Sequence, residues 1–133
     1  MRYVAFIHKD TDSAYGISFP DVPGCIAVGD TMDAVIANGA EALAFHISSM
    51  EADGEAIPAP RPLETIVNDN DLAEDLEGAS FALVPLVRDL GSTTRINVSL
   101  DLGLLRAIDE EARSRGQTRS AFLASAARRE LID

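Results

Sequence analysis

The first part of the chain shows short apolar runs separated by turn-forming residues. Residues 2–8 (RYVAFIH) are rich in β-branched and aromatic side chains, and residues 14–19 (AYGISF) place apolar side chains at every second position. Residues 20–24 (PDVPG) are dense in turn formers, and residues 25–28 form a further short apolar run. Runs of this kind are typical of β-strands. The pattern therefore predicts a three-stranded antiparallel meander.

The next segment changes from a strand period to a helical one. Asp30 or Thr31 can accept hydrogen bonds from the first free amides of a helix, and the helical pattern ends before Gly54. We expect this helix to cover one face of the sheet through a single apolar stripe. The stripe consists of Met32, Val35, Ile36, Gly39, Ala40, Leu43, Ile47 and Met50.

A proline-rich loop and a second strand pattern complete the first domain. Residues 57–62 (IPAPRP) cannot continue a helix, because proline lacks an amide donor and biases the residue before it toward extended geometry. The acidic residues 64–77 have room for a short helix, and residues 79–87 (ASFALVPLV) are predicted to return to the sheet as a strand. We therefore expect a three- to four-stranded antiparallel sheet packed on a helix over residues 1–88.

A hinge at residues 89–93 (DLGST) separates this domain from a second one at residues 94–133. The second domain opens with residues 94–100 (TRINVSL), in which apolar and polar side chains alternate. A strand with this pattern has one apolar and one hydrogen-bonding face. The apolar face carries Ile96, Val98 and Leu100, and the polar face carries Arg95, Asn97 and Ser99.

Two helices follow this strand, and together the three elements are too small to fold alone. The first begins after Asp101 and stops at Gly116, and Thr118 can cap the second. About 40 residues with one strand and two helices cannot bury that much apolar surface within one chain. We therefore expect a homodimer whose shared core contains Ile96, Val98, Leu100, Phe122 and Leu123.

Charge divides the chain in the same way. The net charge is −11, but residues 93–133 hold seven Arg against six Asp and Glu, so 7 − 6 = +1. Residues 1–92 hold four Lys and Arg against sixteen Asp and Glu, so 4 − 16 = −12. An acidic first domain is either solubilised by its charge or complementary to a basic partner.

Several function classes are disfavoured by the composition. No apolar run approaches the ~20 residues of a membrane helix, and the first residues do not form a signal peptide, so we expect a cytoplasmic protein without a membrane partner. A single cysteine, Cys25, and two histidines are too few for a disulfide or a metal site, so no metal or cofactor is expected. Asp10, Asp12, Asp21, Asp30 and Asp33 fall in turns or at a helix start, where we expect them to bond backbone amides rather than act in catalysis.

Residues 94–131 resemble the ribbon-helix-helix repressors. The resemblance rests on the motif RINVSL, a helix, and then GQTRSAFLASAARREL. It implies that two antiparallel strands enter the major groove of double-stranded operator DNA. By this resemblance the bases are read by Arg95, Asn97 and Ser99, whose side chains suit base edges. The phosphates are contacted by Thr118, Arg119 and Ser120 at a helix N-terminus.

Residues from about 3 to 62 resemble the N-terminal domain of HicB-type antitoxins. The motif is GISFPDVPGCIAVGDT, a long helix, and IPAP. The resemblance implies a partial ribonuclease H-like fold that covers the active site of a small basic, mRNA-cleaving HicA-type toxin.

Taken together, the two resemblances predict an α+β antitoxin that is not an enzyme. It blocks the toxin and represses its own operon as a homodimer or a tetramer. The alternatives are a ribbon-helix-helix regulator whose first domain senses a ligand, and an enzyme that uses the acidic domain.

Overall fold

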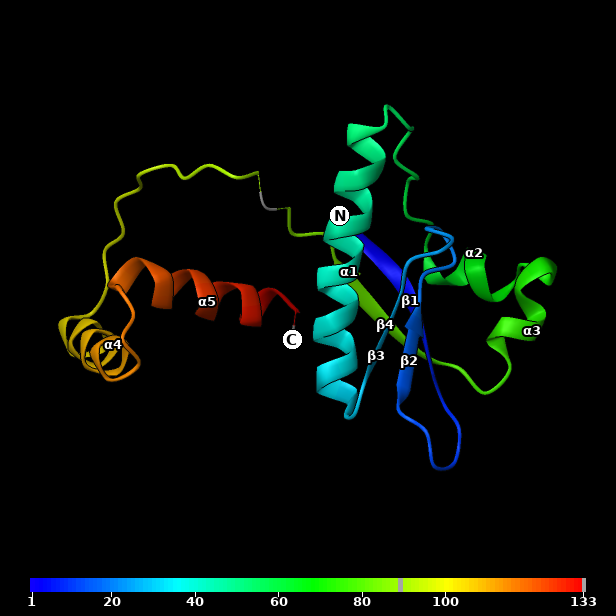
Figure 1. Ribbon diagram of the computed structural model, residues 1–133, viewed down its shortest axis with the longest axis horizontal. Helices are drawn as coiled ribbons and strands as arrows, with labels where there is room; N and C mark the ends of the chain where they lie inside the picture. The colour runs from blue at the N-terminus through cyan, green and yellow to red at the C-terminus, as the bar shows by residue number, and fades with distance from the viewer. Residues whose placement is uncertain (89, 133) are drawn as a thin grey trace. The chain divides into compact units, whose positions relative to one another are not determined.

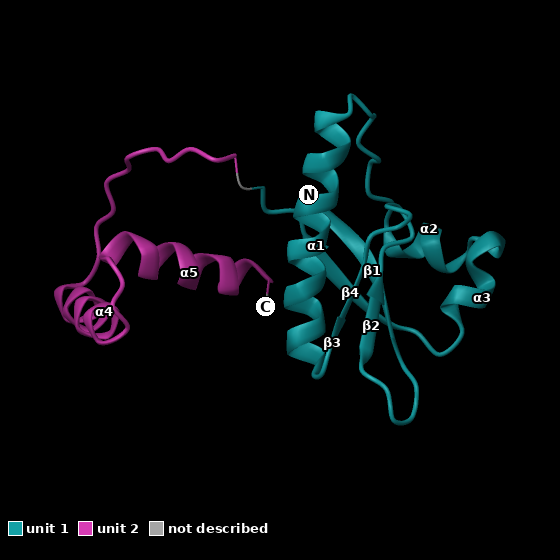
Figure 2. Ribbon diagram, in the orientation of Figure 1, with its two compact units in different colours: residues 1–88 teal, residues 89–133 magenta. Residues whose placement is uncertain are grey.

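The computed structural model describes residues 1–88 and 90–132. The chain divides into two compact units, Met1–Arg88 (unit 1) and Asp89–Asp133 (unit 2), which Figure 2 shows in teal and magenta. The hinge expected at residues 89–93 begins at Asp89, which lies outside the described residues. Within the described ranges, no helix is long and apolar enough to cross a membrane.

Unit 1 contains a four-stranded antiparallel sheet in the order β3-β2-β1-β4 (Figure 1). The expected meander is confirmed as β1 (Arg2–Lys9), β2 (Tyr15–Ser18) and β3 (Ile26–Gly29). The strand expected at residues 79–87 is β4 (Ser80–Pro85), which pairs with β1. The first strand therefore lies inside the sheet, and β3 and β4 form its two edges.

Helix α1 (Met32–Ala52) packs on one face of this sheet through the expected stripe. Of the two candidate caps, Thr31 is the one used, since its hydroxyl oxygen accepts the Ala34 N–H at 3.0 Å. A Cβ atom at Gly39 would lie 2.7 Å from the Cδ1 atom of Ile17, so glycine permits the close approach of α1 to β2. The stripe residues buried in this contact are Val35, Gly39, Ala40, Leu43 and Ile47.

A second layer covers part of the opposite face. The acidic segment forms α2 (Leu63–Val67), the 3-10 helix η1 (Asn70–Leu72) and α3 (Ala73–Leu76). The side chain of Ile66 is fully buried against Val4 and Phe6 of β1. Because β1 is covered on both faces, its central residues are at most 3% exposed.

Unit 2 consists of an extended segment and two helices. Helix α4 (Leu102–Ser114) is capped by Asp101, whose carboxylate accepts the Leu104 N–H at 3.2 Å, and α5 is Arg119–Ile132. Gly116 has a φ of 66°, the left-handed conformation expected of the residue that ends a helix. Residues 92–101 form neither helix nor strand in the single chain. A ribbon needs two chains, so the strand expected at residues 94–100 stays a prediction.

Candidate functional site

The extended segment of unit 2 presents the residues predicted to read DNA bases. The side chains of Arg95, Asn97 and Ser99 are all exposed. The alternating apolar side chains are exposed as well, Ile96 to 74% and Val98 to 60%. Both faces of the segment are therefore open in one chain, and large β-branched side chains are rarely left in this state by folded proteins.

The exposed apolar surface of unit 2 extends beyond the residues predicted for the dimer core. Phe122 and Leu123 are half-buried, and Leu100 is 38% exposed. Leu102 and Leu104, at the start of α4, are 60% and 51% exposed and continue the apolar surface. The available signal was their spacing, because Leu102 and Leu104 continue the apolar positions at every second residue of the segment 96–100.

The residues predicted to contact phosphate lie at the start of α5, as their sequence positions require. The Thr118 hydroxyl oxygen accepts the Ala121 N–H at 3.1 Å, which confirms the predicted cap, and Ser120 is exposed. Arg119 is held by Asp109 of α4, because its Nε and Nη2 atoms donate to the two carboxylate oxygens at 2.8 Å each. These hydrogen bonds raise the pKa of Arg119 and lower that of Asp109.

The role of Asp109 is not visible in the sequence, because it lies on the preceding helix, ten positions from its partner. The two hydrogen bonds to Asp109, called the fork below, use the Nε and Nη2 atoms of the Arg119 guanidinium and do not include Nη1. Arginine presents five N–H donors in a fixed plane. Arg119 is the first residue of α5, so the donors outside the fork belong to a side chain at a helix N-terminus, where an anion is also favoured by the free amides.

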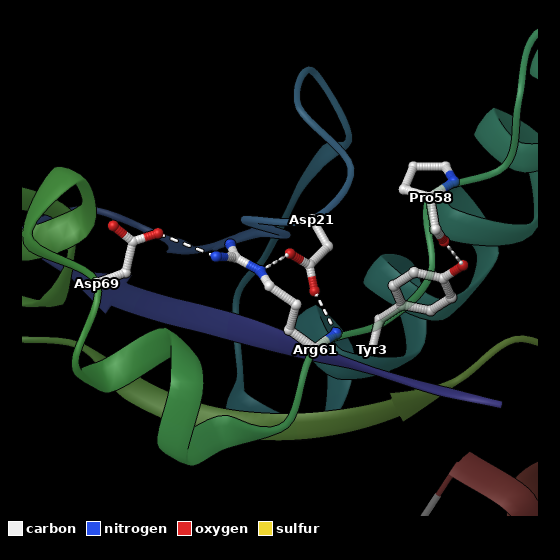
Figure 3. Close-up of polar contacts among 5 residues, drawn as sticks. All are labelled: Tyr3, Asp21, Pro58, Arg61 and Asp69. Carbon is white, nitrogen blue, oxygen red and sulfur yellow. Dashed lines mark hydrogen bonds and ion pairs between the residues drawn. The ribbon is translucent and has the colours of Figure 1, made fainter.

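Unit 1 holds a polar cluster that the sequence analysis missed (Figure 3). The backbone N–H and the Nε atom of Arg61 donate to Asp21 at 2.7 and 2.6 Å, and Nη1 donates to Asp69 at 2.9 Å. The Tyr3 hydroxyl donates to the Pro58 carbonyl oxygen at 2.6 Å. These bonds fasten the proline-rich loop to the sheet and to the turn before β3.

The backbone hydrogen bond expected of Asp21 is confirmed, but its partner is distant. The Asp21 carboxylate, only 6% exposed, accepts the backbone amide of Arg61, 40 residues away, rather than an amide of its own turn. The hydrogen bond from Arg61 lowers the pKa of Asp69, and the bonds to Asp69 and Asp21 raise the pKa of Arg61. The carboxylates are therefore committed to a structural role, and the proline-rich loop has one defined path.

The remaining candidates for chemistry in unit 1 are its cysteine and its possible metal ligands. Cys25 is buried, as expected, and burial raises the pKa of its thiol to about 11, which removes it as a nucleophile near neutral pH. Across the described ranges, no group of three or more His, Cys, Asp and Glu side chains is placed to hold a metal ion.

The chain is similar to known proteins in both sequence and structure. A protein of 14.9 kDa from Haemophilus phage HP1, encoded in its rep-hol intergenic region, is 33% identical over 134 residues, which covers 99% of this chain and 98% of that protein. The crystal structure of the Burkholderia pseudomallei antitoxin HicB has a TM-score of 0.56 and 36% identity, with 98% of each chain covered. A chain in a HicA3 and HicB3 toxin-antitoxin complex has a TM-score of 0.53 and 31% identity, with 64% of this chain and 96% of that chain covered.

The sequence profile described as the HicB-like antitoxin of bacterial toxin-antitoxin systems matches residues 3–127, which includes the described elements of both units up to the middle of α5. The match covers residues 3–62 and most of residues 94–131, the two stretches that carry the resemblances. The chain therefore belongs to the HicB-like antitoxin family.

Proposed function

We propose that this protein neutralises a HicA-type toxin through unit 1 and represses its own operon through unit 2. The observation that carries the proposal is the pairing of two different surfaces on one chain. Unit 1 is acidic and has its own core. Unit 2 has an exposed segment in which apolar side chains alternate with polar side chains of the types that bind DNA bases. Neutralisation and repression are both binding functions, and neither requires a catalytic residue.

The proposal for unit 1 is supported by its relatives and its charge. A similar chain occurs in a HicA3 and HicB3 toxin-antitoxin complex, in which the matched share, 64% of this chain, is close to the length of unit 1. Unit 1 contains four Lys and Arg against fifteen Asp and Glu, so 4 − 15 = −11. Such a surface attracts a basic toxin and accelerates its association. We propose that the sheet and α1 form a reduced ribonuclease H fold.

The proposal for unit 2 is a ribbon-helix-helix dimer. Two copies of residues 94–100 pair antiparallel, which buries Ile96 and Val98 and turns Arg95, Asn97 and Ser99 toward the major groove. Arg119 then contacts phosphate with the donors that Asp109 leaves outside the fork. Pairing of two such dimers through unit 1 gives a tetramer.

The base-reading role is tested by Asn97→Ala in a gel-shift assay with DNA from upstream of the gene. A good bidentate contact contributes ~1–3 kcal/mol of discrimination, so we expect affinity for the operator to fall about 5- to 150-fold while circular dichroism is unchanged. The matched control is Ser92→Ala, because Ser92 is also exposed and precedes the predicted strand. Undiminished affinity in a folded Asn97→Ala variant rejects the role.

The dimer is tested by Val98→Asp. Val98 is 60% exposed in the single chain, so a charge there costs little in a monomer but a great deal inside a shared core. We expect loss of both dimerisation and DNA binding in sedimentation and gel-shift measurements. A stable Val98→Asp dimer that binds DNA overturns the intertwined arrangement.

The division of labour is tested with fragments. Residues 1–88 form a compact unit with their own core and are expected to inhibit RNA cleavage by the toxin without binding DNA. Residues 90–133 are expected to dimerise and bind operator DNA more weakly than the whole chain, since they lose the linkage between dimers. Inhibition of the toxin by residues 90–133 alone contradicts the assignment.

A further inference from the structure

The free edge of strand β4 carries two exposed apolar side chains. Within the described residues β4 pairs with β1 and lies at the end of the sheet, so its other edge is open. Phe81 and Leu83 are 43% and 52% exposed. Their pairing partners on β1 are Phe6 and Val4, which are buried in a cluster with Ile66 of α2. The exposed pair therefore lies at the rim of the layer formed by α2, η1 and α3.

The pairing register determines which backbone groups point away from β1. The Leu86 N–H donates to the Met1 carbonyl oxygen at 2.9 Å, which makes these two residues a hydrogen-bonded pair of the antiparallel ladder. Pair types alternate along such a ladder, so Phe81, Leu83 and Pro85 occupy non-hydrogen-bonded positions. The N–H and C=O groups of Phe81 and Leu83 therefore point toward the open edge.

This edge has little of the protection that isolated edge strands normally carry. Soluble proteins block such edges with Lys, Pro, bulges or inward-pointing charges. Strand β4 reads SFALVP, in which the terminal Pro85 is the single blocking residue and no side chain is charged. An uncharged apolar edge with outward-pointing amides is a template for a strand from another chain.

The charge beside this edge indicates the chemistry of that chain. The elements α2, η1 and α3 lie on the same face as Phe81 and Leu83, because their Ile66 packs against the paired residues of β1. Residues 63–77 contain six acidic side chains and no Lys or Arg. A second copy would bring two such segments together, whereas a strand flanked by Lys and Arg is attracted. The six are Glu64, Asp69, Asp71, Glu74, Asp75 and Glu77.

We propose that unit 1 binds its toxin through the β4 edge. A strand of the basic toxin extends the sheet beyond β4, hydrogen-bonds the outward backbone groups of Phe81 and Leu83, and packs apolar side chains on theirs. The inference rests on the proposed function and adds to it the binding surface and the mode of binding.

Amide hydrogen exchange tests the backbone pairing directly. The probe is the full-length antitoxin, alone and in complex with the toxin that co-purifies with it. In the free protein we expect the amides of Ala82 and Val84, which face β1, to be protected and those of Phe81 and Leu83 to exchange rapidly. In the complex we expect the exchange of Phe81 and Leu83 to slow at least about 100-fold, as for other strand amides. Unchanged exchange at both positions overturns the proposal.

Matched variants test the side chains. Leu83→Lys places a blocking charge on the β4 edge, and Val28→Lys makes the same change in charge on the β3 edge, where Val28 is 67% exposed. If Leu83 is a central anchor, Leu83→Lys raises the constant for inhibition of the toxin by the antitoxin at least about 30-fold. Val28→Lys changes this inhibition constant less than about 3-fold. Equal effects mean that only overall charge matters, and a larger effect of Val28→Lys places the toxin on the β3 edge; either result refutes the proposal.

Two further outcomes are separable. If the wild-type chain fails to inhibit or co-purify with any toxin, the proposed function itself is wrong. If the wild type inhibits, and Leu83→Lys remains folded by circular dichroism and inhibits equally well, only the β4 surface is wrong. Protection of Phe81 and Leu83 that appears on concentrating the antitoxin alone assigns the edge to a second copy and also refutes a toxin strand there.

Discussion

Replacing Asp21 with alanine removes two of the hydrogen bonds that fasten the proline-rich loop. The carboxylate of Asp21 accepts the backbone N–H of Arg61 at 2.7 Å and its Nε atom at 2.6 Å (Figure 3). Asp21 is 6% exposed, whereas the Arg61 side chain is 37% exposed. After the substitution, water can therefore solvate the Arg61 guanidinium, but it reaches the buried site of the missing carboxylate less easily.

The magnitude follows from the number and type of the lost bonds. A hydrogen bond to a charged group contributes ~1.5–3 kcal/mol, and the exposure of Arg61 favours the lower end for the side-chain bond. We expect Asp21→Ala to lower the free energy of unfolding of unit 1 by ~2–3 kcal/mol. For a domain of this size that is a decrease in Tm of about 8–24 °C. Asp21→Asn retains one acceptor oxygen, and we expect it to lose about half as much.

Thermal and urea unfolding followed by circular dichroism measure this loss, and cleavage of residues 57–62 by a protease reports on the loop itself. The control is Glu41→Ala, because Glu41 is an exposed acidic residue of α1, where a substitution is expected to change stability by less than ~0.5 kcal/mol. If Asp21→Ala is as stable as this control and the loop is cleaved no faster, the carboxylate does not anchor the loop and the reasoning fails.

Three further predictions concern packing and ionisation in unit 1. Gly29→Ala should lower the free energy of unfolding of unit 1 by ~3 kcal/mol in urea, because the added Cβ would lie 2.5 Å from a backbone nitrogen of α1. The control Gly16→Ala, whose Cβ would lie 3.9 Å from the nearest atom, should lower it far less. Equal effects of the two substitutions contradict the packing of α1 on Gly29. The lowered pKa of Asp69 contributes stability that is present above its unfolded pKa of ~3.9 and is lost as the pH falls through the folded pKa. Asp69→Asn should therefore make the decrease in Tm below about pH 4.5 less steep. A decrease as steep as that of the wild type rejects this contribution. Cys25, with a pKa of about 11, should react with a thiol reagent at pH 8 only in denaturant, and rapid reaction of the native protein contradicts its burial.

Local patterns were sufficient to predict most elements of both units. The period of α1, its cap at Thr31 and the end of α4 near Gly116 each depend on hydrogen bonds and apolar spacing within a few residues, so they are readable in a single segment. The candidate DNA-reading residues were also found in this way, since alternation along residues 94–100 is a local property. The antitoxin family was predicted from the resemblances of residues 3–62 and 94–131, and the profile match to residues 3–127 confirms the family.

The tertiary structure decided which distant residues meet. The bonds of Asp21 to Arg61 and of Asp109 to Arg119 join segments 40 and ten residues apart, and no periodic pattern encodes such a pair. The apolar run of residues 79–87 predicted a strand but not its position, and only its pairing with β1 leaves Phe81 at an open edge. The physical reason is that secondary structure depends on neighbours along the chain, whereas contacts and exposure depend on the path of the whole chain.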